Sequence, residues 1–210
     1  MLLIKKGREP NSLTEYKKQS NAYYDGCNKS DIRKALLKEQ GYLCAYCMKR
    51  ISETNMTIEH YSTQSNISEK EALDYNNMLG VCLGNRGAGQ ANFTCDAHRG
   101  NASLTVNPFL KQSINLICYQ DDGKIYSTDS EINKDLDKTL NLNCEQVLLK
   151  INREKALGVL KNYLSKLKSK GTWKKEFLEK IKKKYECPNE NGKLDPYSGI
   201  LLYYLNKRIR

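Results

Sequence analysis

Cys44-Ala45-Tyr46-Cys47 opens the part of the sequence that is richest in metal-binding side chains. Two cysteines separated by two residues form the usual half of a tetrahedral zinc site, and Cys82 and Cys95 supply two further thiols. The twelve residues between this second pair are an unusual spacing. A C-x-x-C element also occurs in thiol oxidoreductases, but no thioredoxin-like strand-to-helix pattern surrounds this one. We therefore expect a structural zinc ion bound by Cys44, Cys47, Cys82 and Cys95.

The chain has 8 cysteines, and the redox compartment decides how they are used. Residues 1–6 are too short in their apolar part to form a signal peptide, and no run of about 18 apolar residues predicts a membrane span. We therefore expect a cytoplasmic protein that does not bind membranes. In the reducing cytoplasm, cysteines bind metals or pack as small apolar residues and rarely form disulfides.

The composition is that of a globular protein with a basic surface. Hydrophobic residues make up 39% and charged residues 28% of the 210 residues, which excludes a wholly disordered chain. The formal net charge is +11, and a basic surface favours polyanions such as nucleic acid. A compositional bias toward lysine gives the same charge without any partner, so the charge alone does not decide the function.

Thr57-Ile58-Glu59-His60-Tyr61 lies between the two cysteine pairs and contains the first of the chain's 2 histidines. Its β-branched residues favour a strand, with Glu59 and His60 near the end. Phosphodiester hydrolysis needs a base for water and a hard cation on the phosphate, and imidazole and carboxylate suit these two roles. The other histidine, His98, follows the last of the four cysteines, and a helix that starts at Asp96 would let it face His60. A lone histidine is more often structural, but this grouping favours a site.

The order of these groups resembles the motif of HNH, or ββα-metal, endonucleases. The C-x-x-C element is followed by Glu59-His60, by Asn77 five residues before Cys82, and by a histidine after the last cysteine. In that family the first histidine is the general base, the preceding acidic residue and the third motif residue bind a divalent metal, and the asparagine braces the loop that carries the base. The resemblance implies that His60 is the base and Asn77 the brace. It also implies that Glu59 and His98 bind a catalytic Mg²⁺ or Mn²⁺.

The third motif residue is open between two candidates. His98-Arg99-Gly100 resembles the Asn-Arg-Gly of HNH domains in CRISPR effectors, which favours His98. Many family members instead place this residue directly after the last cysteine, where Asp96 stands. Many family members also have aspartate at the position of Glu59. Glutamate is longer by one methylene, which changes the distance at which its carboxylate can bind the metal.

A narrower resemblance covers most of residues 1–160. It is carried by Ile4-Lys5-Lys6, residues 39–47, Asn107-Pro108-Phe109, Asp122-Gly123-Lys124-Ile125, residues 140–143 and Arg153. These look like the HNH subunit of Septu-type anti-phage systems, which is also the effector of some retrons. The resemblance implies an ATPase partner subunit that holds and restrains the nuclease. The substrate would be nucleic acid, with DNA, tRNA and other structured RNA all open.

The patterns around this motif predict an α+β protein with a zinc-bound ββα-metal HNH core. Residues 1–41 are expected to form an extended N-terminal arm and then a helix from about Ser30, its N-cap, to Gln40. Residues 42–105 would be the nuclease core, with a flexible loop at 85–92.

A mainly helical C-terminal extension is expected over residues 106–210. It would begin with a hairpin of residues 114–119 and 124–126. Helices would follow at about 145–168, 173–185 and 197–206, with a break at Gly171. The extension is a candidate for binding a partner.

Two functions from different classes fit this sequence. The first is a metal-dependent endonuclease, and the alternative is a non-catalytic zinc module that binds nucleic acid or a protein partner. Glu59, His60 and His98 favour the nuclease, because a purely structural module has no use for base and ligand groups beside its zinc. A thiol oxidoreductase would require a C-x-x-C element with a lowered thiol pKa and no zinc.

Overall fold

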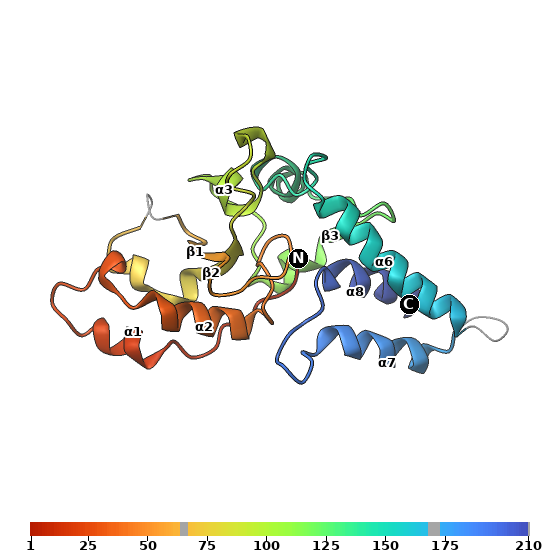
Figure 1. Cartoon of the computed structure of the whole chain (residues 1–210), viewed down its shortest axis with the longest axis horizontal. Coiled ribbons are helices and arrows are strands. Elements are labelled where there is room, and N and C mark those ends of the chain that lie inside the picture. Colours follow the sequence, from red (N-terminus) through yellow and green to blue (C-terminus); the bar gives the residue numbers. More distant parts are fainter. Residues whose placement is uncertain (64–66, 168–172, 210) are drawn as a thin grey trace.

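Helices and short antiparallel strands make up the described part of the chain, which is an α+β protein as the sequence predicts. The structure is a computed structural model, and it describes residues 1–63, 67–167 and 173–209. The N-terminal helices lie at one end of the molecule and the long C-terminal helices at the other, with the strands β1 and β2 between them (Figure 1). Within the described residues, every helix is too short or too polar to cross a bilayer.

The helix α2 (Lys29–Glu39) leads from the N-terminal part into the cysteine-rich centre. Its cap is Asn28 and not Ser30, because the Asn28 side chain accepts a hydrogen bond from the Ser30 amide at 3.0 Å. The helix ends before Gly41, which has a φ of 56°. Buried Gln40 then joins the helix to the centre, since its side-chain amide both donates to the Gly80 carbonyl and accepts from the Gly80 amide, each at 2.7 Å.

The prediction of an extended arm is wrong for residues 11–16, which form the short helix α1 (Asn11–Tyr16). Pro10 precedes it and accepts a backbone hydrogen bond from Leu13 at 3.0 Å. Leu13 is buried, and this burial favours a helical turn where the polar sequence alone indicates none. A 3-10 turn, η1 (Tyr24–Gly26), follows before α2.

The centre of the fold consists of two strands and a helix in the order β-β-α. The strand β1 (Met56–His60) pairs antiparallel with β2 (Met78–Cys82), so that Ile58 lies opposite Gly80 and His60 opposite Met78. Two 3-10 turns, η3 (Glu71–Leu73) and η4 (Tyr75–Asn77), lie between the strands. After β2, the predicted loop at 85–92 contains turns and the 3-10 element η5 (Gln90–Asn92), and the helix α3 (Cys95–Arg99) follows.

The predicted hairpin is present but begins later than the sequence indicates. Its strands are β3 (Ile117–Tyr119) and β4 (Ile125–Ser127), paired antiparallel. The residues before it form the helix α4 (Lys111–Asn115) because Ile114 donates to the Leu110 carbonyl at 3.1 Å and closes a helical turn. The helix α5 (Ser130–Lys134) and the π-helix η6 (Asp135–Thr139) come next.

Three longer helices complete the chain: α6 (Leu149–Lys166), α7 (Lys175–Glu186) and α8 (Ser198–Ile209). Their positions agree with the predicted helices, although α6 begins four residues after the predicted start at 145. The predicted end of that helix at 168 and the break at Gly171 lie outside the described residues. α8 packs against α7, α6 and β3.

One hydrophobic core runs through all three predicted parts of the chain. The segment before α8 lies directly on the turn that carries the first two cysteines. Leu194 donates to the Gly41 carbonyl at 3.1 Å, and the amides of Tyr197 and Gly199 donate to the Met48 carbonyl and sulfur, both at 3.2 Å. The domain boundaries at 41 and 105 therefore stay predictions, since the core crosses both.

Candidate metal centre and the polar groups beside it

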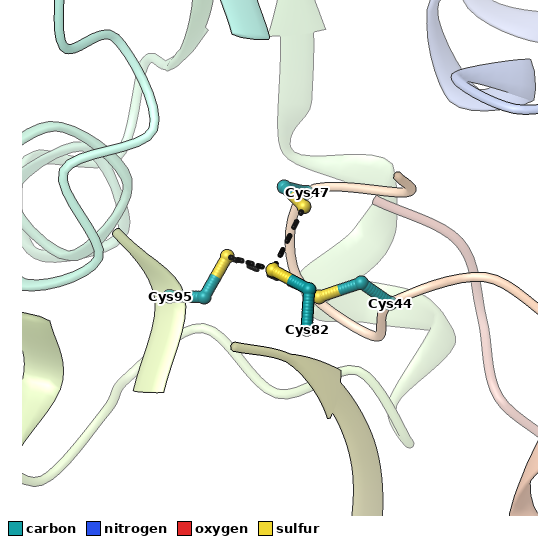
Figure 2. A group of neighbouring side chains, drawn as sticks. All are labelled: Cys44, Cys47, Cys82 and Cys95. Atoms are coloured by element: carbon teal, nitrogen blue, oxygen red, sulfur yellow. Dashed lines mark hydrogen bonds between the residues drawn. The ribbon is translucent and has the colours of Figure 1, made fainter. Parts of the chain in front are cut away.

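Four buried sulfurs come together from segments that are far apart in the sequence (Figure 2). The Sγ atoms all lie within 4.8 Å of one another, at 3.9 Å for Cys44 and Cys95, 3.7 Å for Cys47 and Cys82, and 3.8 Å for Cys82 and Cys95. Tetrahedral zinc with bonds of about 2.3 Å places its sulfurs about 3.8 Å apart, whereas a disulfide needs about 2 Å. The four cysteines thus form a group that can hold a zinc ion.

Each part of this group is fixed by local backbone structure. Cys44 and Cys47 lie on a tight turn in which Cys44 donates to the Lys49 carbonyl at 2.9 Å and accepts from Met48 at 3.0 Å. Cys82 is the last residue of β2 and Cys95 the first of α3. The long spacing between this pair is a loop that leaves β2 and returns, closed by a hydrogen bond of 3.0 Å between residues 94 and 84.

The electrostatics of the four sulfurs also favour a cation. Hydrogen bonds from Cys44, Cys47 and Cys95 lower the pKa of Cys82, whereas the hydrogen bond with Cys44 raises the pKa of both Cys47 and Cys95. Four thiolates this close repel one another, and a divalent cation at the centre removes the repulsion. In the part of the chain that the structure describes, no other set of three or more His, Cys, Asp or Glu side chains is close enough to hold a metal ion.

A second polar group lies where α3 meets the end of β1, and Arg99 is at its centre. The Arg99 side chain is 0% exposed and forms an ion pair with Glu59. Its guanidinium also donates to the Tyr46 hydroxyl at 3.2 Å, and to the carbonyls of His60 at 3.1 Å and Tyr61 at 2.6 Å. Arg99 therefore neutralises the buried carboxylate and fixes α3 against the strand end.

Asp96 lies three residues before Arg99, and residues three apart share one side of a helix. Burial raises the pKa of Glu59, and the Asp96 carboxyl acts in the same direction, while the ion pair with Arg99 opposes both and favours the carboxylate. Asp96 also forms an ion pair of 2.8 Å with Arg86 from the loop after β2. Of the two candidates for the third motif residue, Asp96 is the one whose carboxyl acts on the pKa of Glu59.

His98 points elsewhere. It is exposed, and its Nδ1 lies 3.1 Å from the Thr139 carbonyl of η6. His60 is bonded to a different segment, and no hydrogen bond or ring contact between described residues joins the two histidines. The expectation that His98 faces His60 from the first turn of α3 has no contact to support it.

His60 is buried on the opposite side of the strand from Glu59, because successive side chains of a strand alternate in direction. Its Nε2 lies 2.8 Å from the Ala72 carbonyl, and the Tyr24 ring packs edge-on at 4.6 Å between centroids. Burial lowers the pKa of His60, so the imidazole is neutral at pH 7. A carbonyl only accepts hydrogen bonds, so Nε2 carries the proton and Nδ1 keeps its lone pair.

Asn77 holds the segment that follows His60. Its side-chain oxygen accepts from the Ser62 amide at 2.7 Å, and its side-chain nitrogen donates to the Ser62 carbonyl at 3.0 Å. Its backbone carbonyl also accepts from Tyr61 at 2.8 Å. The neighbouring Asn76 instead bonds to Asp74 at 3.1 Å. These contacts are the ones that the brace interpretation of Asn77 requires.

Reasoning from sequence did not find the roles of Arg99 and Tyr46. Tyr46 lies inside the C-x-x-C element, and its burial at 0% exposure places its hydroxyl beside the Glu59 carboxyl at 3.4 Å. The available signal for Arg99 was its helical spacing of three from Asp96, which puts a cation and an acid on one side of α3.

No family model matches this chain, and a search of curated proteins gave no match.

Proposed function

We propose that this chain is a metal-dependent endonuclease of the HNH type that hydrolyses phosphodiester bonds in nucleic acid. The observation that carries the proposal is the junction of β1 and α3, where Arg99 of α3 pairs with buried Glu59 and Asp96 lies one helical turn before Arg99. Arginines pair with both carboxyls, Arg99 with Glu59 and Arg86 with Asp96, and a divalent cation would bind the carboxyls in place of such a partner. Oxygen ligands are those that Mg²⁺ and Mn²⁺ prefer. Such an ion would act as a Lewis acid on a phosphate oxygen.

His60 would act as the general base in this proposal. Its hydrogen bond to the Ala72 carbonyl fixes the tautomer in which Nδ1 is free to accept a proton from water. A neutral imidazole at pH 7 is the form that this role needs. His60 and Glu59 are adjacent residues at the end of β1, on its two sides, so the strand end sets their relative position, and α3 adds Asp96.

Asn77 and Arg99 would act as positioning residues. Asn77 holds the backbone at Ser62, two residues after the base. Arg99 binds the carbonyls of His60 and Tyr61 and so fixes the end of the strand from the other side. Preorganised groups of this kind contribute to catalysis because no binding energy is lost in ordering them.

The four-cysteine group would hold zinc as a structural ion. Its four sulfurs are buried and leave no position for a substrate, which is the pattern of closed structural sites. The group joins the turn after α2, the end of β2 and the start of α3. β2 pairs with the strand that carries Glu59, and α3 carries Asp96.

Our proposal for the biological setting rests on the sequence resemblance described above. We propose that the chain is an effector nuclease in anti-phage defence, of the Septu or retron kind, and that an ATPase partner restrains it. The net charge of +11 supports a polyanionic substrate, either DNA or RNA.

A second candidate, a non-catalytic zinc module, is favoured by one observation. Arg99 already pairs with Glu59, and its guanidinium is satisfied by four further acceptors, as a structural network would be. In this reading Glu59, Arg99 and Asp96 only join α3 to β1.

A cleavage assay separates the two candidates. Plasmid DNA and total cellular RNA are incubated with the zinc-loaded chain and Mg²⁺ or Mn²⁺, with and without the products of its neighbouring genes, among which the proposal expects an ATPase subunit. The nuclease proposal expects cleavage that needs the added metal and is lost in His60→Ala. Absence of cleavage in both settings, with zinc bound and the fold intact, would leave the non-catalytic module.

A further inference from the structure

A pocket of about 480 Å³ lies between β3, α6 and α8, in a part of the chain that the proposed reaction does not use. Buried Tyr119 and Leu157 form its floor. The last two turns of α8 contribute two tyrosines and two basic residues, Tyr203, Tyr204, Lys207 and Arg208. This volume falls within the range of about 300–1,000 Å³ that is usual for small-molecule sites.

The tyrosines and cations of α8 are paired by helical spacing. Residues four apart lie on one side of a helix, and Lys207 and Arg208 each follow a tyrosine by four. The Arg208 guanidinium carbon lies 3.4 Å from the ring centroid of Tyr204, and the Lys207 ammonium lies 5.5 Å from that of Tyr203. The pocket wall therefore presents cations that are held over flat aromatic rings.

The charge in this pocket is not neutralised by the protein. Asp121 lies at the rim, but its carboxylate forms an ion pair of 2.9 Å with Lys161. Within the described residues, Lys207 and Arg208 are exposed and form no ion pair. Basic residues in the last turn of a helix also offset the helix dipole, and that role alone requires no ligand.

The floor of the pocket is aromatic and apolar. Tyr119 and Tyr203 lie 5.8 Å apart between ring centroids, with their planes at 60°, and Leu157 is only 2% exposed. Aromatic side chains bind nucleobases by stacking, and lysine and arginine bind phosphate through charge-assisted hydrogen bonds. A nucleotide carries both groups in one molecule.

We propose that this pocket binds a nucleotide unit, with the base against Tyr119 and Tyr203 and the phosphate on Lys207 and Arg208. The unit is either a free nucleotide or one residue of a single strand, since both present a base and a phosphate. The inference does not depend on the proposed nuclease activity.

Fluorescence titration of the full, zinc-loaded chain with mant-labelled ATP, without added magnesium, tests this proposal. Unlabelled ATP and a short single-stranded DNA oligonucleotide serve as competitors. Displacement by ATP identifies a free nucleotide, displacement by the oligonucleotide alone identifies a strand, and either result supports the pocket. Displacement by inorganic phosphate at the same concentration as ATP would overturn it, because a simple anion patch would then explain the binding.

Variants locate the binding. We expect Lys207→Ala with Arg208→Ala to weaken binding by about tenfold or more, and Arg208→Lys to weaken it as well because lysine lacks the planar group that stacks. The matched control is Lys183→Ala with Lys184→Ala, which removes the same charge from the exposed side of α7. No saturable binding to the wild type, or equal affinity of the α8 pair and the α7 control, would refute the proposal.

Discussion

Asn77 holds Ser62 through both ends of its side-chain amide, accepting at 2.7 Å and donating at 3.0 Å. The two bonds span fifteen residues and close the segment between β1 and β2 just after His60. Asn77 itself is only half-buried, so we expect the two bonds to order the end of β1 more than they stabilise the whole fold.

We expect Asn77→Ala to reduce cleavage more than it reduces stability. The two lost hydrogen bonds correspond to about 1–2 kcal/mol of unfolding free energy, since each contributes about 1 kcal/mol. The cleavage rate should fall further, by about tenfold or more, because the base is no longer held in position. Denaturant titration and single-turnover kinetics measure the two effects. Asn76→Ala is the control, and an equal loss of activity there would contradict the brace role.

The third motif residue can be identified by a pair of substitutions on α3. If the proposed metal site exists, we expect Asp96→Asn to abolish metal-dependent cleavage, because Asp96 lies on α3 one helical turn before Arg99, the partner of Glu59. His98→Ala should leave the rate within a few fold, since His98 is exposed and bonds to the Thr139 carbonyl. The reverse result would assign the catalytic ligand to His98. Zinc content measured on both proteins shows whether the four-cysteine group is intact.

Arg99 should be among the most sensitive positions for stability. Replacing it with alanine leaves the Glu59 carboxyl buried without its cation, and breaking a buried ion pair costs about 3–5 kcal/mol. Arg86→Ala breaks an ion pair at a side chain that is 48% exposed, and should cost no more than about 1 kcal/mol. Chemical denaturation of both variants gives the comparison. Similar losses would mean that the Glu59–Arg99 pair is not the main contact between α3 and β1.

Zinc should be bound at about one ion per chain and should be necessary for folding. We expect Cys44→Ser to lose the ion and most of the tertiary structure of the cysteine-rich centre, because structural zinc contributes folding free energy directly. Metal analysis and near-ultraviolet circular dichroism report the two changes. Cys187→Ser is the matched control, since Cys187 is exposed and lies outside the group. A full zinc content in Cys44→Ser would exclude this ligand set.

A substitution at Gly199 tests the contact between the start of α8 and the turn that carries Cys44 and Cys47. A Cβ atom there would lie 2.8 Å from the Met48 sulfur and 2.8 Å from the Tyr119 hydroxyl. We therefore expect Gly199→Ala to lower the unfolding free energy by about 1–3 kcal/mol, as overpacking does. Gly158→Ala, in α6 with nothing within 4 Å, should instead raise it by about 0.5–1 kcal/mol. Thermal unfolding that ranks these two variants in the opposite order would contradict the packing.

The parts of the site that were predictable are those set by spacing along the chain. The C-x-x-C element and two later cysteines were enough to predict the four-sulfur group. The helices α6, α7 and α8 followed from apolar periodicity, which depends on local sequence alone.

The polar contacts of the site depend on tertiary packing and were not predictable. Glu59 pairs with Arg99 only because the loop after β2 returns α3 to the end of β1. His98 is turned away because η6 offers it the Thr139 carbonyl, and no sequence pattern indicated a π-helix at 135–139. Leu13 is a similar case, since its burial produces a helix in a polar segment.

Residues 194–199 contact the turn that carries Cys44 and Cys47. This contact couples metal binding at the cysteines to the position of α8. Met48, between Cys47 and the rest of the turn, accepts hydrogen bonds from Tyr197 and Gly199 at the entry to α8. Loss of a zinc ion bound to the four cysteines would disorder this turn and so weaken the contacts that hold the start of α8. If the four cysteines hold a zinc ion, thermodynamic reciprocity requires the converse: a ligand or partner that binds α8 in one of these two states changes the affinity of the cysteines for the ion.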